Sequence, residues 1–536
     1  MSVHTCLIGY SDSGAEREIY FRHCLSLYEF LRILTYFLQL FFLHSSLQEV
    51  APLSYAFIGS YFLNPYYARY EEALNLAAAK FVGERGASTT TVDLDDGGDQ
   101  EGEGEMLLQT VKKQQQQDQT TQTKLYTLVR AKNVGMTAIL LFARDPTAVI
   151  RIEEAERGFG AADMGNKGAV GLRVIWRGDA DQETEVTFVA AHLAAMEWNL
   201  KKRNANWRSI ASGLTFTNPR AALPGLFKAS TAGPTPDQSG VGEGPSSRRG
   251  TGVEDSSEAT SEEEDEETDD QPLLRDDDDQ SLAPEHHATL RDTSVFKPSS
   301  YLFVSGDLNY RISSTTPPPM STFPSFDSSS PNHYSTFLSR DQLTQERMAG
   351  RAFHGMSEAP IEFGPTYKYN VLDKPDGAVN EAAVRSGAEV DGVPEVPWKF
   401  APHRWPGWCD RVLFLDLPSS LKTEGKKMDV RAYNSLPLAR TSDHRAVFLR
   451  VRVPVVGGEA MRKALEEEES DGSSRDPRVN LPVPIDVHAW ERREAARRKE
   501  MLVGFSAFLW STQEGALVLA TFVLIGVGSW WVSRVW

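Results

Sequence analysis

The sequence of 536 residues predicts an α/β fold, in which layered β-sheets form the core and helices flank them. Strand-like apolar runs outnumber helical patterns, which favours a sheet-based core. Four low-complexity inserts interrupt residues 46–454, and removing them leaves roughly 250 residues, the size of one large α/β domain. Polar motifs lie at the ends of several predicted strands, where loops gather catalytic residues. We therefore expect one site built from distant segments.

Apolar runs bounded by turn residues predict strands at residues 125–131, 137–143, 169–176, 184–191, 301–305, 411–415 and 447–453. The helical spacing of Tyr70, Leu74 and Ala77 predicts a helix over residues 66–81. A second amphipathic pattern predicts a helix over residues 196–214. These elements give a two-layered sheet core with helices outside it.

The inserts are identified by composition and are predicted to be disordered, because they cannot bury enough apolar surface. They cover residues 87–123, 219–292, 313–332 and 373–397. Between Glu254 and Asp279 there are fifteen acids and one base, a net charge of −14, so the rest of the chain carries only −4 of the formal −18. The acidic balance therefore belongs to an insert, for which the sequence names no protein partner.

The first 45 residues are atypical. Residues 25–43 are apolar, but Glu29, Arg32 and Gln39 interrupt them and no small-residue cleavage site follows, so they make a poor signal sequence. Either they form a buried helix or they are not native to the protein. Three cysteines, Cys6, Cys24 and Cys409, give no regular disulfide framework, which fits a reducing compartment.

The C-terminal segment predicts a membrane anchor. Residues 515–533 carry no charge, and nineteen helical residues span roughly 28 Å, close to the thickness of a bilayer core. A linker at residues 455–514 precedes them, and its basic cluster at 491–499 is expected on the cytosolic side, with Trp530 and Trp531 at the opposite interface. We expect a tail anchor, in the endoplasmic reticulum since the polar end is short; a buried core helix is the alternative.

Residues suited to metal-assisted phosphate chemistry follow the strand at 301–305. Gly306 allows a turn that directs Asp307 and Asn309, two residues apart, to the same side. An ionised Asp can orient water and an Asn amide can donate to a phosphoryl oxygen, whereas an Asx turn that closes the strand is the simpler alternative. Asp410 lies in a partly buried loop and needs a partner, for which His444 is a candidate.

Two further residues are candidates with simple structural alternatives. Glu49 lies in an apolar setting and would supply a hard oxygen ligand for Mg²⁺, although a lone Glu is usually solvated. His192 ends a predicted strand, where a histidine can also serve as a cap. Neither residue decides a function by itself.

The motifs together are more specific. In chain order the sequence contains Leu47-Gln48-Glu49, Gly165-Asn166-Lys167-Gly168-Ala169-Val170, His192-Leu193-Ala194-Ala195, Arg203-Asn204, Gly306-Asp307-Leu308-Asn309-Tyr310-Arg311, Pro365-Thr366-Tyr367-Lys368-Tyr369, Trp408-Cys409-Asp410-Arg411 and Ser442-Asp443-His444. This order resembles the signature of the inositol polyphosphate 5-phosphatases, in a C-terminally tail-anchored, fungal-type form. The resemblance spans residues 47–453. It implies the endonuclease/exonuclease/phosphatase fold, a four-layer sandwich of two sheets flanked by helices.

The resemblance also implies a role for each matched residue. The catalytic set would be Asp307, which positions water, Asn309, a donor to the scissile phosphate, His192, which contacts phosphate, and His444, oriented by Asp410. Substrate binding would fall to Lys167, Tyr367, Lys368, Arg404 and Arg411. Metal ligands for Mg²⁺ would be Glu49 and Asp443. The implied reaction removes the 5-phosphate of phosphatidylinositol 4,5-bisphosphate at a cytosolic membrane face.

One departure from the family pattern leaves alternatives open. The family begins with a strand that ends in a Trp-Asn or Phe-Asn pair, and nothing before Glu49 matches it. If the missing strand abolishes metal binding, the chain would be an inactive, membrane-anchored phosphoinositide reader or scaffold, with the acidic insert as a partner-binding tail. A nuclease of the same fold is a weaker alternative, because the chain has no long basic tract for a nucleic-acid backbone.

Overall fold

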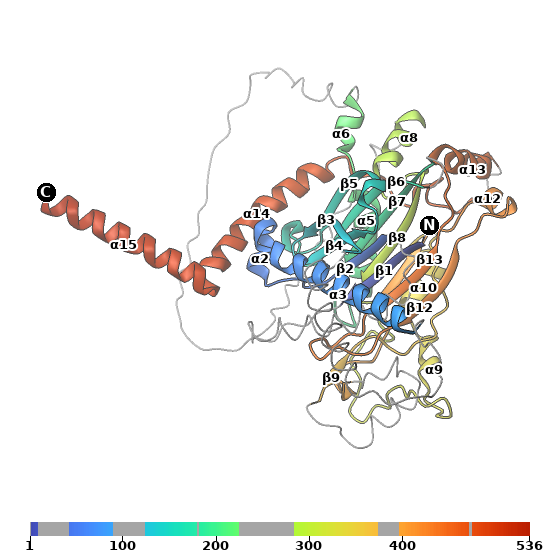
Figure 1. The fold of residues 1–536 in the computed structure, drawn as a ribbon, viewed down its shortest axis with the longest axis horizontal. Coiled ribbons are helices and arrows are strands. Elements are labelled where there is room, and N and C mark those ends of the chain that lie inside the picture. The colour runs from blue at the N-terminus through green and yellow to red at the C-terminus, as the bar shows by residue number, and fades with distance from the viewer. Residues whose placement is uncertain are drawn as a thin grey trace, which may run out of the picture.

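Two β-sheets pack face to face between outer helices in the computed structural model (Figure 1). The structure describes residues 2–8, 42–88, 124–178, 182–224, 284–372, 396–470 and 474–536. The predicted acidic segment, most of the inserts 87–123, 219–292 and 373–397, and residues 9–41 of the apolar N-terminal region lie outside the described residues.

The six-stranded sheet has the order β12-β13-β1-β2-β4-β3. Its strands are β1 (Ser2–Ile8), β2 (Phe42–Leu47), β3 (Thr127–Val134), β4 (Thr137–Ala143), β12 (Asp429–Ser435) and β13 (Val447–Arg452). The five-stranded sheet has the order β11-β8-β7-β6-β5. Its strands are β5 (Val149–Gly158), β6 (Gly168–Arg177), β7 (Glu183–His192), β8 (Ser300–Asp307) and β11 (Asp410–Phe414). A small hairpin pairs β9 (Tyr369–Val371) with β10 (Trp398–Phe400).

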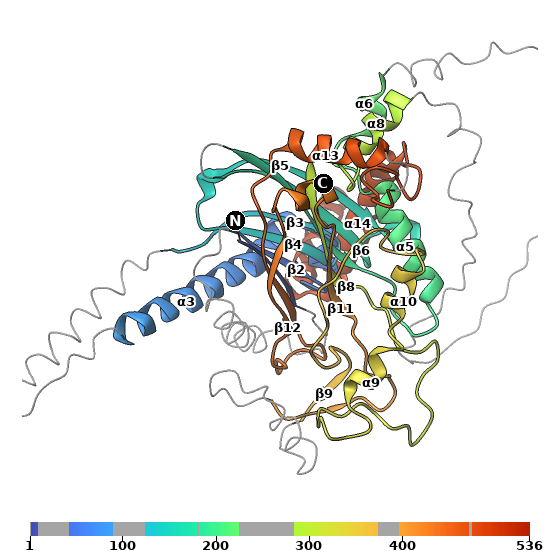
Figure 2. The same cartoon turned by 90° about the vertical axis from the view of Figure 1, so that its right-hand side faces the viewer.

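Helices cover the outer faces and the ends of the sheets, as Figures 1 and 2 show. The helices of the described residues are α2 (Leu53–Ile58), α3 (Asn64–Ser88), α5 (Leu200–Gly213), α6 (Pro219–Ala222), α8 (Pro284–Thr293), α9 (Tyr334–Leu338), α10 (Gln342–Met348), α12 (Ser419–Thr423), α13 (Gly458–Ser470), α14 (Ala489–Ser511) and α15 (Gln513–Val535). Short 3-10 turns are η1 (Ser60–Phe62), η2 (Pro146–Ala148) and η3 (Ala161–Asp163).

Strand alternation divides the core into layers. In β4, Ile139 and Leu141 face the space between the sheets, whereas Leu140 and Phe142 face the side covered by α3. On the other sheet, Phe303 of β8 packs between the sheets and its neighbours Leu302 and Val304 pack beneath α5. The order helix, sheet, sheet, helix confirms the predicted layered α/β architecture.

All seven predicted strands are present, and the two predicted helices correspond to α3 and α5. The strands β5 and β12, which the sequence patterns did not predict, lie at the edges of their sheets. Edge strands tolerate charged side chains. In β5 the charged residues between Arg151 and Glu156 interrupt the alternation of apolar and polar residues that identifies a strand. The strand β1 was not predicted either, because residues 1–45 read as unrelated sequence, and it lies between β2 and β13.

Two segments expected to be disorder or linker are ordered by packing. Residues 313–332 form a loop in which the ring of Phe326 packs 5.5 Å from Trp398 and 5.6 Å from Tyr334. In the predicted linker, α13 buries Met461 and Leu465 in the core between the sheets. Aromatic and apolar contacts made far along the chain therefore order segments whose composition is polar.

The C-terminal helix α15 is the one helix of the described residues that is long and apolar enough to cross a membrane. Its most apolar window has a mean hydropathy of 1.9 and is almost entirely exposed. The predicted span at residues 515–533 lies inside it, and Figure 1 shows that α15 extends away from the body of the molecule.

Candidate active site

The strand ends of the five-stranded sheet meet in one row. Gly168, at the start of β6, lies opposite His192, at the end of β7. His192 lies opposite Asp307 on the parallel strand β8, and Asp307 lies opposite Asp410, which begins β11. The residue before β6 is Lys167. Backbone register alone therefore brings together four side chains that are up to 243 residues apart in the sequence.

Asp307 is the centre of this row. Its Oδ1 accepts a hydrogen bond of 3.0 Å from the backbone N–H of Asn309, and its Oδ2 accepts one of 2.8 Å from the Asn309 side chain. His192 Nε2 lies 3.3 Å from Oδ2. Burial alone would raise the pKa of Asp307, but His192 and the charges of His444 and Lys167 outweigh burial and hold that pKa far below its usual range. Asp307 is therefore ionised across the physiological pH range.

Gly306 is required for this arrangement. Its φ is +150°, in the region that favours glycine, and a Cβ on it would lie 1.8 Å from the backbone oxygen of Ala191. Asn309 itself has a φ of +56°, which Asn tolerates better than most residues. The chain therefore leaves β8 by a sharp turn that directs Asp307 and Asn309 into the same site.

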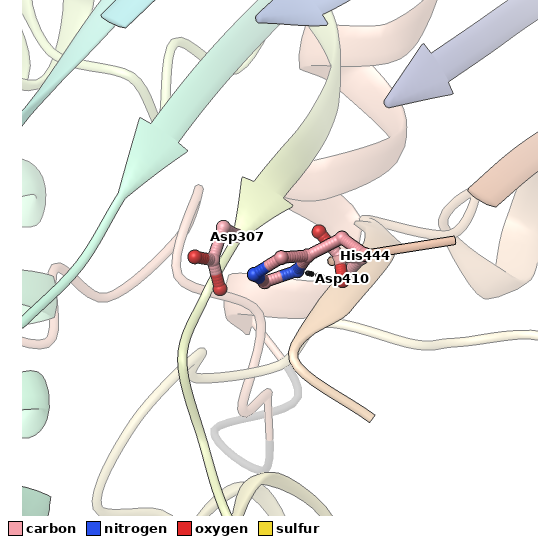
Figure 3. A group of neighbouring side chains, drawn as sticks. All are labelled: Asp307, Asp410 and His444. Atoms are coloured by element: carbon pink, nitrogen blue, oxygen red, sulfur yellow. Dashed lines mark hydrogen bonds and ion pairs between the residues drawn. The ribbon is translucent and has the colours of Figure 1, made fainter. Parts of the chain in front are cut away.

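His444 lies between two carboxylates, as Figure 3 shows. Its Nδ1 is 2.9 Å from Asp410 Oδ2, and the other ring edge faces Asp307. Burial lowers the pKa of His444, but the two carboxylates outweigh it and raise that pKa to about 9. At neutral pH the ring is therefore an imidazolium that can donate a proton or a hydrogen bond. The predicted pairing of Asp410 with His444 is confirmed.

The other end of the row carries Lys167, His192 and Glu49. Lys167 Nζ is 2.5 Å from His192 Nε2 and 3.7 Å from Glu49 Oε1. Burial and the neighbouring lysine charge lower the pKa of His192, so this imidazole is neutral at pH 7 although the other one, His444, is charged. Burial also lowers the pKa of Lys167, which Glu49 and Asp307 partly offset.

A cationic and aromatic wall borders the site. The ring of Tyr367 lies 4.5 Å from that of His444, and Lys368 Nζ is 5.4 Å from the centre of the Tyr367 ring. Arg404 approaches fully buried Glu197 at 3.6 Å, and its charge acts on Lys368. The structure thus brings three of the predicted substrate-binding residues to one side of the row.

Two predicted residues do not have the expected surroundings. Arg411 is completely buried, and binds Glu358 at 2.6 Å and Asp341 at 2.9 Å. Successive residues of a strand face opposite sides, so Arg411 points away from the site that Asp410 enters. Asp443, the second predicted metal ligand, has its Oδ2 2.8 Å from Lys368 Nζ and thereby holds that lysine.

The carboxylate of Glu49 is an oxygen donor of the kind that a hard divalent cation prefers. Glu49 has a φ of +53°, and its carboxylate is partly exposed beside the row. Among the described residues, Asp307, Asp410 and His444 have ligand atoms within 4.8 Å of one another. The imidazolium of His444 occupies that group and cannot coordinate a cation while protonated. Glu49 therefore fits Mg²⁺ better, as one carboxylate completed by waters and substrate oxygens.

Sequence reasoning missed residues that support the motifs. Arg311 donates from Nη2 to Asn309 Oδ1 and lies 4.4 Å from the centre of the Tyr367 ring. Thr366 Oγ1 accepts from the backbone N–H groups of Cys409 and Asp410, which fixes the start of β11. Arg311 lies two residues after Asn309, and this spacing could have indicated that the two side chains interact. The contact of Thr366 with β11 depends on the fold and has no signal in the sequence.

A family model and several known proteins are similar to large parts of this chain. The family model described as Endonuclease/Exonuclease/phosphatase family 2 matches residues 45–450. The Type II inositol polyphosphate 5-phosphatase 14 of Arabidopsis thaliana is 27% identical over 267 residues, which cover 50% of this chain and 17% of the relative. The Inositol-1,4,5-trisphosphate 5-phosphatase 1 of Schizosaccharomyces pombe is 22% identical over 347 residues, which cover 64% of this chain and 21% of the relative. The chain thus matches about a fifth of the length of these relatives.

One solved structure is similar to part of this chain. The inositol polyphosphate 5-phosphatase domain of synaptojanin, in complex with inositol (1,4)-bisphosphate and calcium, is 16% identical with a TM-score of 0.42. The superposition covers 88% of this chain and 93% of that one.

Proposed function

Since the chain belongs to the endonuclease/exonuclease/phosphatase family 2, we propose that it is a Mg²⁺-dependent phosphatase that removes the 5-phosphate from phosphatidylinositol 4,5-bisphosphate. The observation that carries the proposal is the row from Lys167 to Asp410, with His444 placed as an imidazolium between Asp307 and Asp410. Curated relatives named as inositol polyphosphate 5-phosphatases support the ring position of the leaving phosphate.

The residues divide the work of hydrolysis. Ionised Asp307 accepts a hydrogen bond from the attacking water and orients it towards phosphorus. The imidazolium of His444 donates to a phosphoryl oxygen, where negative charge grows in the transition state. Asn309 Nδ2 donates to Asp307 Oδ2 and to the backbone oxygen of Leu193, so Asn309 orients the carboxylate that holds the water. Asp410 holds His444 in the orientation that this contact needs. Mg²⁺ bound at Glu49 would polarise the phosphate and neutralise part of its charge.

The cationic wall suits a second phosphate next to the scissile one. Lys368 and Arg404 carry positive charges on the same side of the site, and Tyr367 offers a hydroxyl and a ring face. A 4-phosphate on the same inositol ring would meet these groups when the 5-phosphate reaches Asp307. We therefore assign Tyr367, Lys368 and Arg404 to the 4-phosphate, with Asp443 holding Lys368 in place.

The apolar helix α15 supports a membrane location for this reaction. Its length and composition fit a bilayer, and a lipid substrate places the reaction at a membrane surface. We assign the catalytic domain to the cytosolic face of the membrane that α15 crosses, because the cations of residues 491–499 precede that helix.

The test uses the full chain in detergent micelles and in vesicles. Phosphate release is measured from vesicle-bound phosphatidylinositol 4,5-bisphosphate and from soluble inositol 1,4,5-trisphosphate, with Mg²⁺ or with EDTA. The variant Asp307→Asn should lose release by at least about a hundredfold. Asp145→Asn is the matched control, because Asp145 is an exposed cap far from the row and Asn also caps well.

Three outcomes would contradict the proposal. Binding of the lipid without Mg²⁺-dependent release would favour the inactive reader, and cleavage of single-stranded DNA in place of inositol phosphates would favour the nuclease. A product that has lost the 4-phosphate would show that the ring lies in the opposite orientation.

A further inference from the structure

The helix α14 packs against the catalytic domain through a face that contains charged as well as small residues. The residues Ala489, Arg493, Ala496, Glu500 and Gly504 are buried, and their spacing of three or four places them along one stripe of the helix. The stripe crosses β5, η3 and α2 before the chain enters α15 (Figure 1). A segment that reads as a polar juxtamembrane linker is thus packed against the domain.

Glu500 is the central contact of this stripe. Its side chain is fully buried, and its Oε1 accepts a hydrogen bond of 2.8 Å from the backbone N–H of Gly165. Arg493 donates to both carboxylate oxygens, at 2.6 and 2.8 Å, and also contacts Glu156 of β5. A buried carboxylate needs such partners, and here one of them is the backbone of another loop.

Gly165 is close to Lys167 and Glu49, the residues at the end of the site that we assign to phosphate and metal. Two residues after it stands Lys167, which contacts His192 and Glu49. The backbone oxygen of Gly165 accepts from Met136 N–H at 3.1 Å, and Met136 in turn accepts from Val50 N–H, next to Glu49. One carboxylate of α14 is therefore connected to both Lys167 and Glu49 by short backbone contacts.

A second contact reaches the same region from α2. Arg497 donates to the backbone oxygens of Phe57 and Ile58, at the C-terminal end of α2, and lies 3.4 Å from Glu500. A Cβ on Gly504 would lie 2.9 Å from Phe57 Cβ, so the helices touch closely. The helix α2 begins four residues after Glu49. Contacts of α14 with the C-terminal end of α2 therefore restrain the segment that runs from Glu49 into α2.

We infer that α14 is a positioning element of the active site, in which Glu500 holds the Gly165 to Lys167 loop and Arg497 holds the Glu49 to α2 segment. The helix that precedes α15 thereby determines the positions of Lys167 and Glu49. Glu500 and Arg497 touch no reacting atom, and they act through Lys167 and Glu49. The inference rests on the proposed function for its kinetic measurements only.

The test compares Glu500→Ala with Glu494→Ala in the full chain, because Glu494 is an exposed glutamate on the same helix. Soluble inositol 1,4,5-trisphosphate is the substrate, so that binding to a membrane cannot account for a difference. Glu500→Ala should lower kcat/KM about tenfold or more relative to Glu494→Ala, since small misplacements of positioning groups are costly. Glu500→Gln keeps an acceptor for Gly165 and should recover most of the loss. Equal kcat/KM in the two alanine variants would overturn the inference.

Arg497→Gln covers the case in which Glu500→Ala does not fold. Arg497 is partly exposed, and the matched control is Arg498→Gln at an exposed position on the same turn. Arg497→Gln should raise the Mg²⁺ concentration for half-maximal activity several-fold, because it loosens the segment of Glu49. An unchanged Mg²⁺ requirement would contradict the role of α14 at the metal end.

Amide hydrogen exchange separates this inference from the proposed function. If the unaltered chain releases no phosphate, the proposed function fails, but exchange at Gly165 to Lys167 still reports the contact. Faster exchange there in Glu500→Ala, with no change in Glu494→Ala, would retain the positioning role. Unchanged exchange in both variants would overturn it.

Discussion

The two sheets contribute to the site in different ways. The five-stranded sheet supplies His192, Asp307 and Asp410 as neighbours in one backbone register. The six-stranded sheet supplies Glu49 from the segment after β2 and His444 from the segment before β13. Side-chain contacts join the two groups, namely His444 with Asp410 and Glu49 with Lys167. The site can therefore be weakened at these contacts without breaking a sheet.

The largest effect is expected at the contact between His444 and Asp410. In Asp410→Asn the carboxylate that raises the pKa of His444 most is gone, and only Asp307 and Asp443 still oppose the effect of burial, so that pKa falls and a smaller fraction of the imidazole is charged at neutral pH. We expect kcat to fall by about 10²–10⁴ at neutral pH, the range for a lost proton donor. In the unaltered chain, activity should fall as pH rises through about 9, the pKa of His444. In Asp410→Asn that decline should begin at lower pH.

Stability gives an independent check of the same pair. A histidine whose pKa is raised in the folded state stabilises the fold below its unfolded pKa of 6.5, and this stability is lost as pH rises through about 9. Urea unfolding of the unaltered chain at pH 6 and pH 10 should show that loss, and Asp410→Asn should show less of it. An unshifted pH–rate profile in Asp410→Asn would remove Asp410 as the cause of the charge on His444.

The next effect concerns Arg411, beside Asp410 but on the opposite face. Arg411→Met leaves Asp341 and Glu358 buried without their cation, which should cost about 3–5 kcal/mol of stability. The folded fraction should keep its KM, because the side chain does not reach the site. Urea unfolding and substrate titration measure both, with Arg431→Met at an exposed position as control. A raised KM without lost stability would restore Arg411 to the substrate site.

Glu49 tests the contribution of the six-stranded sheet. Glu49→Gln removes the charge that fits the cation and should raise the Mg²⁺ concentration for half-maximal activity at least about tenfold. Saturating Mg²⁺ should recover most of kcat, because the row on the other sheet is intact. A Mg²⁺ activation curve checks this, with exposed Glu183→Gln as the control. A lower kcat with an unchanged Mg²⁺ requirement would move the cation away from Glu49.

The same contrast explains what the sequence could predict. The motif of Asp307 ends a strand and the motif of Asp410 begins one, and both strands have a clear apolar pattern. The strands and the pairing of Asp410 with His444 were therefore predictable. The opposite orientation of Arg411 follows from strand alternation, but the motif resemblance had assigned it to the substrate. Successive side chains of a strand point to opposite faces, so the position of Arg411 next to Asp410 was enough to predict that Arg411 faces away from the site.

Other features depend on the fold and leave no pattern in the sequence. The buried stripe of α14 contains Arg493, Glu500 and small residues, so its composition reads as a solvated helix. Its burial depends on partners such as Gly165, more than 300 residues earlier in the chain. Asp443 follows the same logic, because only the folded chain shows that Lys368 is its partner.

The smallest expected effect is on substrate choice, at Arg404. Arg404→Gln removes a charge-assisted contact to a 4-phosphate, worth about 1.5 kcal/mol or tenfold. The ratio of kcat/KM for inositol 1,4,5-trisphosphate to that for inositol 1,5-bisphosphate should therefore fall about tenfold. Lys399→Gln, an exposed lysine on β10, should leave the ratio unchanged.

Arg404 also neutralises Glu197, whose side chain is fully buried, so the single variant disturbs both substrate binding and the fold. The double variant Glu197→Gln with Arg404→Gln removes the unpaired buried charge and isolates the contact with substrate. The lower ratio should persist in the double variant, while stability should recover. If the ratio returns to normal together with stability, Arg404 supports the wall around the site and the discrimination of the 4-phosphate belongs to Lys368 and Tyr367.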